Sequence, residues 1–593
     1  MPNSQDILIG TVLESSISYI AIEIKDKKVF ETNKDFLQIG KYLKVQIGNN
    51  HCLVVIIYNI KSNQSHNGDD IILSFIVQAQ PIGLISEDKF ERGSLMLPVP
   101  TEHVYLMDDD TLALLYSSNE SYSFELGKLV QNKATKLYID GNKFFSKHIA
   151  IVGSTGAGKS CAVAKILQDV VGISDAKNKH IENKKNAHVI IFDIHSEYRS
   201  AFSVATEEKF TLNMLDVDNL ILPYWLMNSE ELESIFIESN EANSHNQVSQ
   251  FKKAVVLNKE KHNPKLERVT YDTPVYFDIQ EVYTYIYNLN NEVIGKLVGE
   301  HKPKLADETL INHPNKLEYF ERKLEFITTS TAKADKASNG AFNGEFNRFL
   351  SRLETKLSDK RLKFLLSPKN SNGEEYHTKD FEIILRQFLG YIDKANVTIL
   401  DLSGIPFEVL SITISLVSRL IFDCCFHYSK LKHDEDLLND VPFMIVCEEA
   451  HNYVPRDNNV DYRPSRKSIE RIAKEGRKYG LSLMVVSQRP SEVSETIFAQ
   501  CNNFISLRLT NVNDQNYIRS LMPENSNAIA DILPNLAIGQ CLIVGEAVPL
   551  ASIVQLELPN PMPKSETINF HDSWITDWKE ITFTDIIMRW KKV

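Results

Sequence analysis

A glycine-rich segment of eight residues has the composition and spacing that bind a chain of phosphates. It fits the pattern G-x-x-x-x-G-K-[ST] and consists of Gly153, Ser154, Thr155, Gly156, Ala157, Gly158, Lys159 and Ser160. The apolar run 148–152 before it predicts a buried parallel strand, and 162–171 after it predicts a helix. Such a turn gathers backbone N–H groups at the positive end of a helix dipole. We therefore expect ATP to bind here, with Lys159 bridging the β- and γ-phosphates and the Ser160 hydroxyl as a ligand of Mg²⁺.

A second motif far along the chain supplies acidic groups. The apolar segment 442–447 predicts a strand and ends directly in Glu448 and Glu449. In an ATPase site, Glu448 would hold the magnesium shell, and Glu449 would orient or deprotonate the attacking water. The alternative is a pair of surface carboxylates at a strand end. The phosphate loop upstream disfavours that alternative, and the acidic pair in turn disfavours a chance match of the phosphate loop.

Two more predicted strands end in polar residues. Asp193 ends the strand 189–193, where doubly wound sheets place ligand chemistry, and we expect it or the nearby Glu197 to contribute to nucleotide binding. Capping of the following loop is the rival role. Gln488 follows the strand 483–487 and is the candidate to sense the γ-phosphate or hold the water.

The stretch 466–478 predicts a basic helix. On a lone helix these charges would be a solvated face. In a ring ATPase, such a helix can place an arginine in the neighbouring subunit's site, which contributes about 10³–10⁵ in rate. Arg477 is the first candidate and Arg471 the second, because spacing alone does not separate them.

These motifs require a sheet that brings distant strand ends together. Strands separated by helical stretches predict an α/β fold with a mostly parallel sheet. The predicted strands are 189–193, 397–401, 443–447, 483–487, 504–509 and 540–544. The nucleotide-binding core is thus expected in two pieces, 137–227 and 396–560.

The remaining segments differ in pattern. Residues 1–118 alternate apolar and polar residues in short runs, which predicts a small β-barrel, joined to the core by a polar link. Residues 228–395 are charged and helix-prone and predict a helical insertion, with helical periodicity in 230–237 and 317–326 and a flexible loop over 328–344. The lysine- and asparagine-rich stretch 175–186 reads as a solvated loop. Residues 561–593 are expected to form a C-terminal tail or brace.

Composition bounds the class of protein. The chain has 593 residues, 43% of them hydrophobic and 24% charged, as in soluble globular proteins. Its seven cysteines form no C-x-x-C pair and predict reduced core residues in the cytoplasm. No run of 18 apolar residues occurs, so we expect no membrane segment. The net charge of −13 argues against a surface that coats DNA, but it leaves room for a narrow basic channel.

The order of the motifs resembles the HerA branch of the HerA/FtsK ATPases. The matching segments are GSTGAGKS, FDIHSEY, CEEAHNYVP, RIAKEGRKYG, VVSQRP and LPNLAIGQCLIVGEAVPLASIVQLELP, after a small barrel. The resemblance covers residues 1–228 and 396–560. It implies a RecA-like P-loop core, a homohexameric ring with ATP between subunits, and duplex DNA in the central channel. It also implies a barrel crown that docks a partner, either a nuclease or a sirtuin-like, NAD-consuming effector, in antiphage defence or DNA-end processing.

One family position departs from the pattern. The family often has Arg-His before the phosphate-loop strand, acting toward the neighbouring subunit, and this chain has Lys147-His148. Lysine keeps the charge but loses the bidentate fork. Lys147 therefore stays a candidate for contacting nucleotide in trans.

Three further classes of function compete with a DNA motor. The hexamer could instead be a nucleotide-stabilised scaffold that activates an effector without transport, which the acidic composition favours slightly and the intact Glu449 and Gln488 disfavour. A conjugation or secretion motor is disfavoured by the missing membrane segment. A protein unfoldase of the AAA+ type is disfavoured because SQRP after a CEEAH strand is not its pattern.

Overall fold

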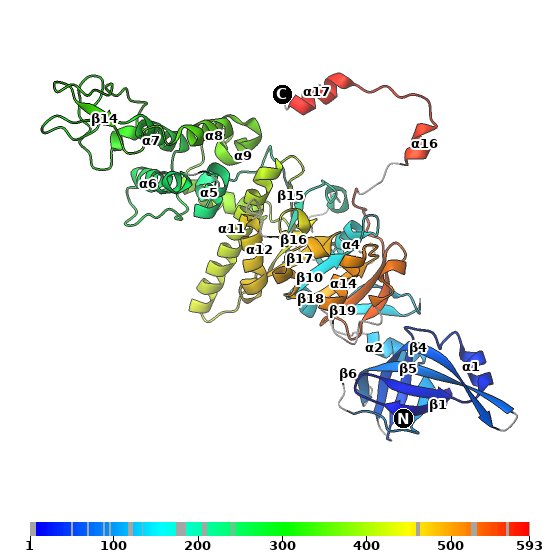
Figure 1. The fold of residues 1–593 in the computed structure, drawn as a ribbon. Helices are drawn as coiled ribbons and strands as arrows, with labels where there is room; N and C mark the ends of the chain where they lie inside the picture. The colour runs from blue at the N-terminus through cyan, green and yellow to red at the C-terminus, as the bar shows by residue number, and fades with distance from the viewer. Residues whose placement is uncertain are drawn as a thin grey trace.

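The computed structural model places the chain in three parts, an N-terminal barrel, a central sheet covered by helices, and a helical projection (Figure 1). It describes residues 7–591 apart from 49–50, 68–69, 87–88, 94–95, 117–122, 133, 174–185, 204–209, 239–240, 242, 458–462, 523–529 and 565–568. The stretch predicted as a solvated loop, 175–186, falls outside the described residues except for Asn186.

The N-terminal part is a closed antiparallel barrel of six strands, with a seventh short strand attached to the last of them. Its strands are β1 (Leu8–Ser15), β2 (Ile20–Ile24), β3 (Tyr42–Ile47), β4 (His51–Asn67), β5 (Asp70–Ser86), β6 (Lys89–Arg92) and β7 (His103–Leu106). Their order is β2-β1-β7-β3-β4-β5-β6, and a β2–β5 pairing closes the barrel. Helix α1 (Lys27–Asn33) packs on it through Phe30, which stacks on Phe75. The apolar residues that alternate along these strands fill the interior.

The central sheet has eleven strands in the order β12-β15-β11-β16-β17-β10-β18-β19-β20-β8-β9. The seven strands from β12 to β18 are parallel, and the other four are antiparallel. Their bounds are β10 (His148–Val152), β11 (His188–Asp193), β12 (Leu212–Leu215), β15 (Val397–Asp401), β16 (Phe443–Cys447), β17 (Leu481–Ser487), β18 (Cys501–Leu507), β19 (Gln540–Gly545) and β20 (Ser552–Leu556). The predicted α/β class with a mostly parallel sheet is confirmed.

The sheet begins earlier in the chain than the sequence pattern indicates. Strand β8 (Ser123–Leu129) pairs with β20, and β9 (Lys136–Asp140) pairs with β8. Both strands lie at least partly in the stretch that was expected to be a polar link. They belong to the sheet because their apolar side chains, including Leu126 and Leu137, are buried in its core.

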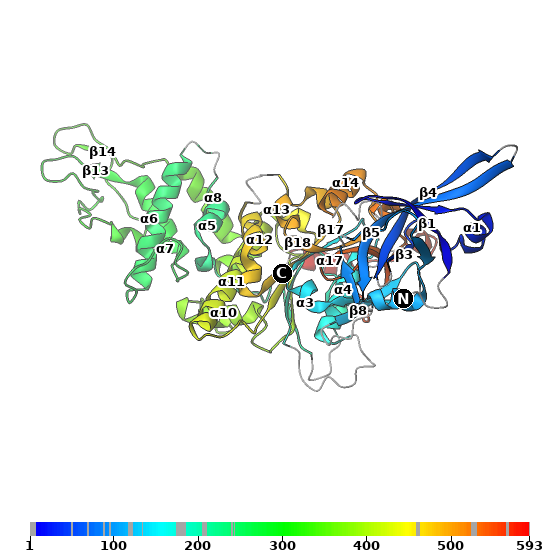
Figure 2. The same cartoon turned by 90° about the horizontal axis from the view of Figure 1, so that it is seen from below.

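Helices cover both faces of the sheet (Figures 1 and 2). They are α2 (Asp109–Tyr116), α3 (Gly141–Phe145), α4 (Lys159–Val171), α11 (Phe407–Asp434), α12 (Arg463–Glu475), α13 (Glu495–Phe498) and α14 (Val512–Leu521). Among the described helices, α11 is long and apolar enough to cross a membrane by length and composition. However, 78% of its apolar window is buried inside the protein. It is therefore a core helix, packed against α12.

Residues 228–395 form a projection in which helices are joined by long irregular segments. Its helices are α5 (Ser229–Phe236), α6 (Ser244–His262), α7 (Ile279–Asn291), α8 (Asn347–Ser358), α9 (Lys363–Leu366) and α10 (Phe381–Phe388). Two short strands, β13 (Val293–Gly295) and β14 (Ala337–Asn339), pair within it. The projection extends away from the barrel (Figure 1), but its apolar residues share one continuous core with the sheet.

Two predictions inside the projection differ from the structure. The helix expected over 317–326 shrinks to a 3₁₀ turn, Leu317–Phe320. The Asn288 amide donates to the carbonyls of Tyr319 and Arg322 and accepts from Leu324 N–H, so it takes groups that a longer helix would pair internally. The stretch 328–344, expected to be a flexible loop, contains β14.

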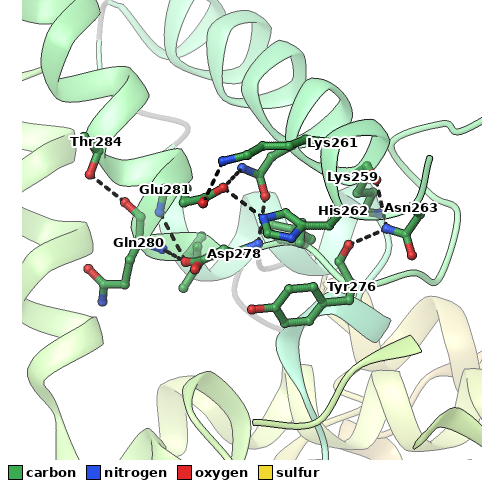
Figure 3. Close-up of polar contacts among 12 residues, drawn as sticks. Lys259, Lys261, His262, Asn263, Tyr276, Asp278, Gln280, Glu281 and Thr284 are labelled. Atoms are coloured by element: carbon green, nitrogen blue, oxygen red, sulfur yellow. Dashed lines mark hydrogen bonds and ion pairs between the residues drawn. The ribbon is translucent and has the colours of Figure 1, made fainter. Parts of the chain in front are cut away.

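A cluster of hydrogen bonds and ion pairs connects α6 to α7 (Figure 3). The Glu281 carboxylate on α7 lies 2.8 Å from Lys261 Nζ and 2.9 Å from His262 Nε2, both at the end of α6. Asn258 donates to the same carboxylate over 2.6 Å. Basic groups at a helix C-terminus thus face an acidic group in the first turn of the next helix, which suits both helix dipoles.

The C-terminal tail carries α16 (Phe570–Trp574) and α17 (Phe583–Lys591), which are exposed along their length. The segment before them is held on the core. Asn560 N–H donates to Gln168 Oε1 on α4, and Gln168 Nε2 donates to the Pro561 carbonyl. Lys564 N–H donates to the Glu197 carbonyl, so the tail starts directly beside the loop that follows β11.

Candidate nucleotide site

The phosphate loop joins β10, a central strand between β17 and β18, to the first turn of α4. Gly156 and Gly158 have φ of 74° and 102°, a left-handed backbone that favours glycine. A Cβ at Gly153 would lie 2.9 Å from Cβ of Leu507 on β18. Close packing and left-handed turns therefore explain why glycines occupy these positions, and the predicted strand–turn–helix is present.

The end of β16 brings carboxylates to this loop. Lys159 Nζ lies 3.8 Å from Glu449 Oε1, and both side chains are buried. Glu449 has a left-handed φ of 45°, a strained backbone for a non-glycine residue that turns its side chain toward Lys159. A carboxylate beside the phosphate-loop lysine can orient or deprotonate a water molecule next to the γ-phosphate.

Gln488 reaches the same place from the end of β17. Its side-chain oxygen accepts a 2.6 Å hydrogen bond from Thr155 Oγ1 in the phosphate loop. Its backbone N–H points to Glu449 Oε2 over 3.4 Å. The structure therefore brings Lys159, Glu449 and Gln488 together from three parts of the chain.

His451 also belongs to this cluster, although no sequence motif predicted a role for it. Its Nδ1 lies 3.3 Å from Glu449 Oε2 and 3.2 Å from the Ser487 hydroxyl. Burial lowers the pKa of His451 and so favours the neutral form of the ring beside Glu449. The sequence signal that could have identified His451 is its position two residues after Glu449 in the CEEAH segment.

Glu448 points to the other side of the strand end. Its carboxylate is buried and accepts a 2.7 Å hydrogen bond from the Tyr198 hydroxyl. Burial, followed by the charge of Glu449, raises the pKa of Glu448 to about 8. Without a cation nearby, Glu448 therefore holds a proton at neutral pH.

Asp193 caps the loop that follows β11. Its carboxylate oxygens accept the backbone N–H groups of Glu197 (3.1 Å) and Tyr198 (2.9 Å), and burial raises its pKa. This geometry matches the capping alternative, and a direct role in nucleotide binding stays a prediction. The side chain that reaches the phosphate loop is that of Glu197, whose Oε2 accepts a 2.6 Å hydrogen bond from Ser160 Oγ.

The donor set fits a hard divalent cation such as Mg²⁺. The Ser160 hydroxyl and the Glu448 carboxylate are oxygen ligands of the kind that Mg²⁺ prefers. The described residues hold no group of three or more His, Cys, Asp or Glu that would form a complete metal cage. Nucleotide sites typically hold Mg²⁺ by one or two protein groups together with phosphate oxygens, so a full cage is not required. When bound, the cation would neutralise charge on the phosphates.

Two of the predicted trans residues lie at the opposite edge of the sheet. Lys147 precedes β10, and its Nζ lies 3.2 Å from Glu546 Oε2. Arg477, in the 3₁₀ turn Gly476–Tyr479 before β17, donates to Asn502 Oδ1 over 3.2 Å, and Asn502 donates to Glu546. One strand length, about 15 Å, separates them from the phosphate loop of their own chain. Any contact with a phosphate would therefore involve a neighbouring subunit.

Arg471 is engaged within its own subunit. Its guanidinium lies 4.2 Å from the Phe422 ring centroid and 3.7 Å from the Asp423 carboxylate, both on α11. These contacts join α12 to α11. Arg477 bonds the neutral side-chain amide of Asn502 and is the better candidate of the two.

Comparison with known proteins identifies relatives of this chain. The family profile described as the central domain of helicase HerA matches residues 124–421. The probable DNA double-strand break repair helicase HerA of Methanocaldococcus jannaschii is 24% identical over 527 residues, covering 85% of this chain and 90% of the relative. The DNA double-strand break repair helicase HerA of Pyrococcus furiosus is 23% identical over 481 residues, covering 77% and 72%. A solved structure of the bacterial conjugative coupling protein TrwB matches with a TM-score of 0.39 at 11% identity, covering 77% and 94%.

Proposed function

Because this chain belongs to the HerA helicase family and is an ATPase, we propose that it uses ATP hydrolysis to move along duplex DNA. The observation that carries the catalytic half of the proposal is the convergence of Lys159, Glu449 and Gln488 at one phosphate loop. The DNA half is supported by the relatives from Methanocaldococcus jannaschii and Pyrococcus furiosus, which are named as DNA double-strand break repair helicases.

Each residue of the cluster has a defined task in hydrolysis. Lys159 and the loop amides bind the β- and γ-phosphates. Glu449, held by its left-handed backbone and by His451, accepts a proton from the attacking water. Gln488 bridges from Thr155 toward that water and reports whether a γ-phosphate is present. Hydrolysis then changes the contacts of β16 and β17 at once, because both strands end in this cluster.

We further propose that the active form is a homohexamer with DNA in its channel. The support is that Arg477 and Lys147 lie at the sheet edge remote from their own phosphate loop, where a neighbouring subunit is needed for them to contact ATP. The barrel would form a crown for a nuclease or an NAD-consuming effector, in antiphage defence or DNA-end processing in the cytoplasm.

The test is the ATP hydrolysis rate of the purified chain with and without linear duplex DNA at two salt concentrations. We expect stimulation by DNA that weakens at higher salt, because phosphate contacts release counterions. Lys159→Ala and Glu449→Gln should abolish hydrolysis, and Asp169→Asn, at the far end of α4, is the matched control. Equal hydrolysis in all variants would contradict the assignment of the site. An ATP hydrolysis rate that is the same with and without DNA would contradict translocation.

The net charge of −13 favours one alternative, a nucleotide-stabilised scaffold that activates an effector without transport. Under that alternative, effector activation survives Glu449→Gln but not removal of residues 1–118. Under the motor proposal, Glu449→Gln abolishes both hydrolysis and effector control.

A further inference from the structure

The loop between β11 and the 3₁₀ turn Arg199–Phe202 is held from several sides. Ser196 has a left-handed φ of 57°, and its hydroxyl donates to Asp401 Oδ2 over 2.7 Å. Asp193 accepts the next two backbone N–H groups. On the outer side, the Glu197 carbonyl accepts Lys564 N–H over 2.9 Å. A strained residue fixed in this way indicates that the direction of the following side chain matters.

That side chain is Glu197, and it is directed at the phosphate loop. Its Oε2 accepts a 2.6 Å hydrogen bond from the Ser160 hydroxyl. A serine hydroxyl has one proton and two lone pairs. When the hydroxyl donates its hydrogen bond to a carboxylate, its lone pairs remain free to bind a cation. The same hydrogen bond prevents the hydroxyl from rotating its proton toward the positive charge.

We propose that Glu197 is a positioning residue for the divalent cation of the ATP site, acting through Ser160. Outer groups that orient a metal ligand are part of many metal sites, and their removal typically weakens metal affinity about 10–100-fold. The neighbouring Tyr198 donates to Glu448, the other predicted cation residue, over 2.7 Å. One short loop therefore sets the orientation of both predicted ligands.

This inference concerns the ATPase site alone and does not depend on DNA movement. The test measures the dissociation constant of a fluorescent ADP analogue in EDTA and again in excess Mg²⁺, without DNA. The ratio of the two constants isolates the contribution of the cation. A failure of the DNA proposal leaves this ratio unaffected.

We expect Glu197→Ala to reduce the Mg²⁺-dependent gain in affinity about 10–100-fold while the affinity in EDTA stays within about twofold of wild type. Glu197→Gln keeps an acceptor for the Ser160 hydroxyl and should restore most of the gain. Glu197→Asp, one methylene shorter, should restore less than Gln. Asp169→Asn on α4 is the matched control and should behave as wild type.

A double variant separates positioning from loop structure. If Glu197 acts through Ser160, Glu197→Ala should reduce the Mg²⁺ gain no further in a Ser160→Ala background. Equal losses of affinity in EDTA and in Mg²⁺ would overturn the proposal and leave Glu197 as a structural residue of the loop. If Glu197→Ala does not fold, the Mg²⁺-dependent gain in affinity is compared between Glu197→Gln and Glu197→Asp, and we expect the larger gain for Gln. A wild-type gain in both variants would also overturn the proposal.

Discussion

At the scale of single residues, the consecutive carboxylates Glu448 and Glu449 face different environments. Glu449 lies beside Lys159 and His451, whereas Glu448 is enclosed with the Tyr198 hydroxyl. Burial disfavours the charged form of Glu448, and the adjacent Glu449 charge adds to this effect. The two carboxylates therefore differ in role: Glu448 is protonated until a cation is bound, and Glu449 lies beside Lys159.

This difference predicts a pH-dependent stability of the cation-free protein. The pKa of Glu448 rises from 4.5 to about 8 on folding, so the folded state holds the proton between about pH 5 and pH 8 and the unfolded state does not. Stability from this group is present at low pH and is lost as the pH rises through 8. In EDTA, we expect the melting temperature of wild type to fall over this window relative to Glu448→Gln, which has no such titration. Parallel curves for the two proteins would contradict the assignment.

At the scale of elements, the α6–α7 pair depends on a buried lysine. Lys259 is fully buried on α6, and its Nζ donates to the carbonyls of Tyr271 (2.6 Å) and Thr273 (2.7 Å) in the connection to α7. Burial lowers its pKa to about 8. This one group bonds two carbonyls of the connection and so fixes its path.

Removing that group should loosen the projection and leave the ATP site intact. Lys259→Ala removes the side-chain donor from the Tyr271 and Thr273 carbonyls, and only the Thr273 carbonyl also accepts the Val275 N–H, so we expect a cost of about 1–3 kcal/mol. We expect faster hydrogen exchange over residues 258–276 and unchanged nucleotide affinity. Lys253→Ala, exposed on the same helix, is the control and should exchange as wild type. Protection that survives Lys259→Ala would show that other contacts hold the connection.

At the scale of the whole molecule, the groups for one reaction lie at two ends of the sheet. The phosphate loop, Glu449 and Gln488 occupy the carboxyl ends of β10, β16 and β17, and Arg477 with Lys147 occupies the opposite edge. A head-to-tail ring would bring these two edges together between neighbouring subunits. Each ATP site would then be completed by the next copy of the chain.

Mixing two inactive variants tests this arrangement. Arg477→Ala and Glu449→Gln should each lower hydrolysis about 10³-fold or more. In an equal mixture, about a quarter of the interfaces combine an intact Glu449 with an intact Arg477, so activity should return. Arg471→Ala is the control, because Arg471 contacts Phe422 and Asp423 of its own subunit. This variant should hydrolyse ATP without being mixed with another variant. No recovery in the first mixture would contradict a role for Arg477 in trans.

Local patterns predicted much of the fold because they depend on short-range chemistry. The phosphate loop, the α/β class, the helices 162–171 and 230–237, and the strand-poor projection follow from glycine spacing and apolar periodicity, and the structure confirms them. Glycine spacing and apolar periodicity did not predict the strands β8 and β9 or the short turn at Leu317–Phe320. Pairing with β20 and the amide of Asn288 come from residues distant in the sequence, and no local pattern carries them.

By itself, the sequence identified Lys159, Ser160, Glu448, Glu449 and Gln488 as candidate groups of the site, because each follows a recognisable strand or turn. Only the tertiary structure decided how they are oriented. It places Asp193 on the loop backbone and Glu197 on Ser160, and it adds His451 beside Glu449. The reason is physical: a strand end fixes which edge of the sheet a side chain reaches, but hydrogen bonds across separate strands fix the direction in which it points.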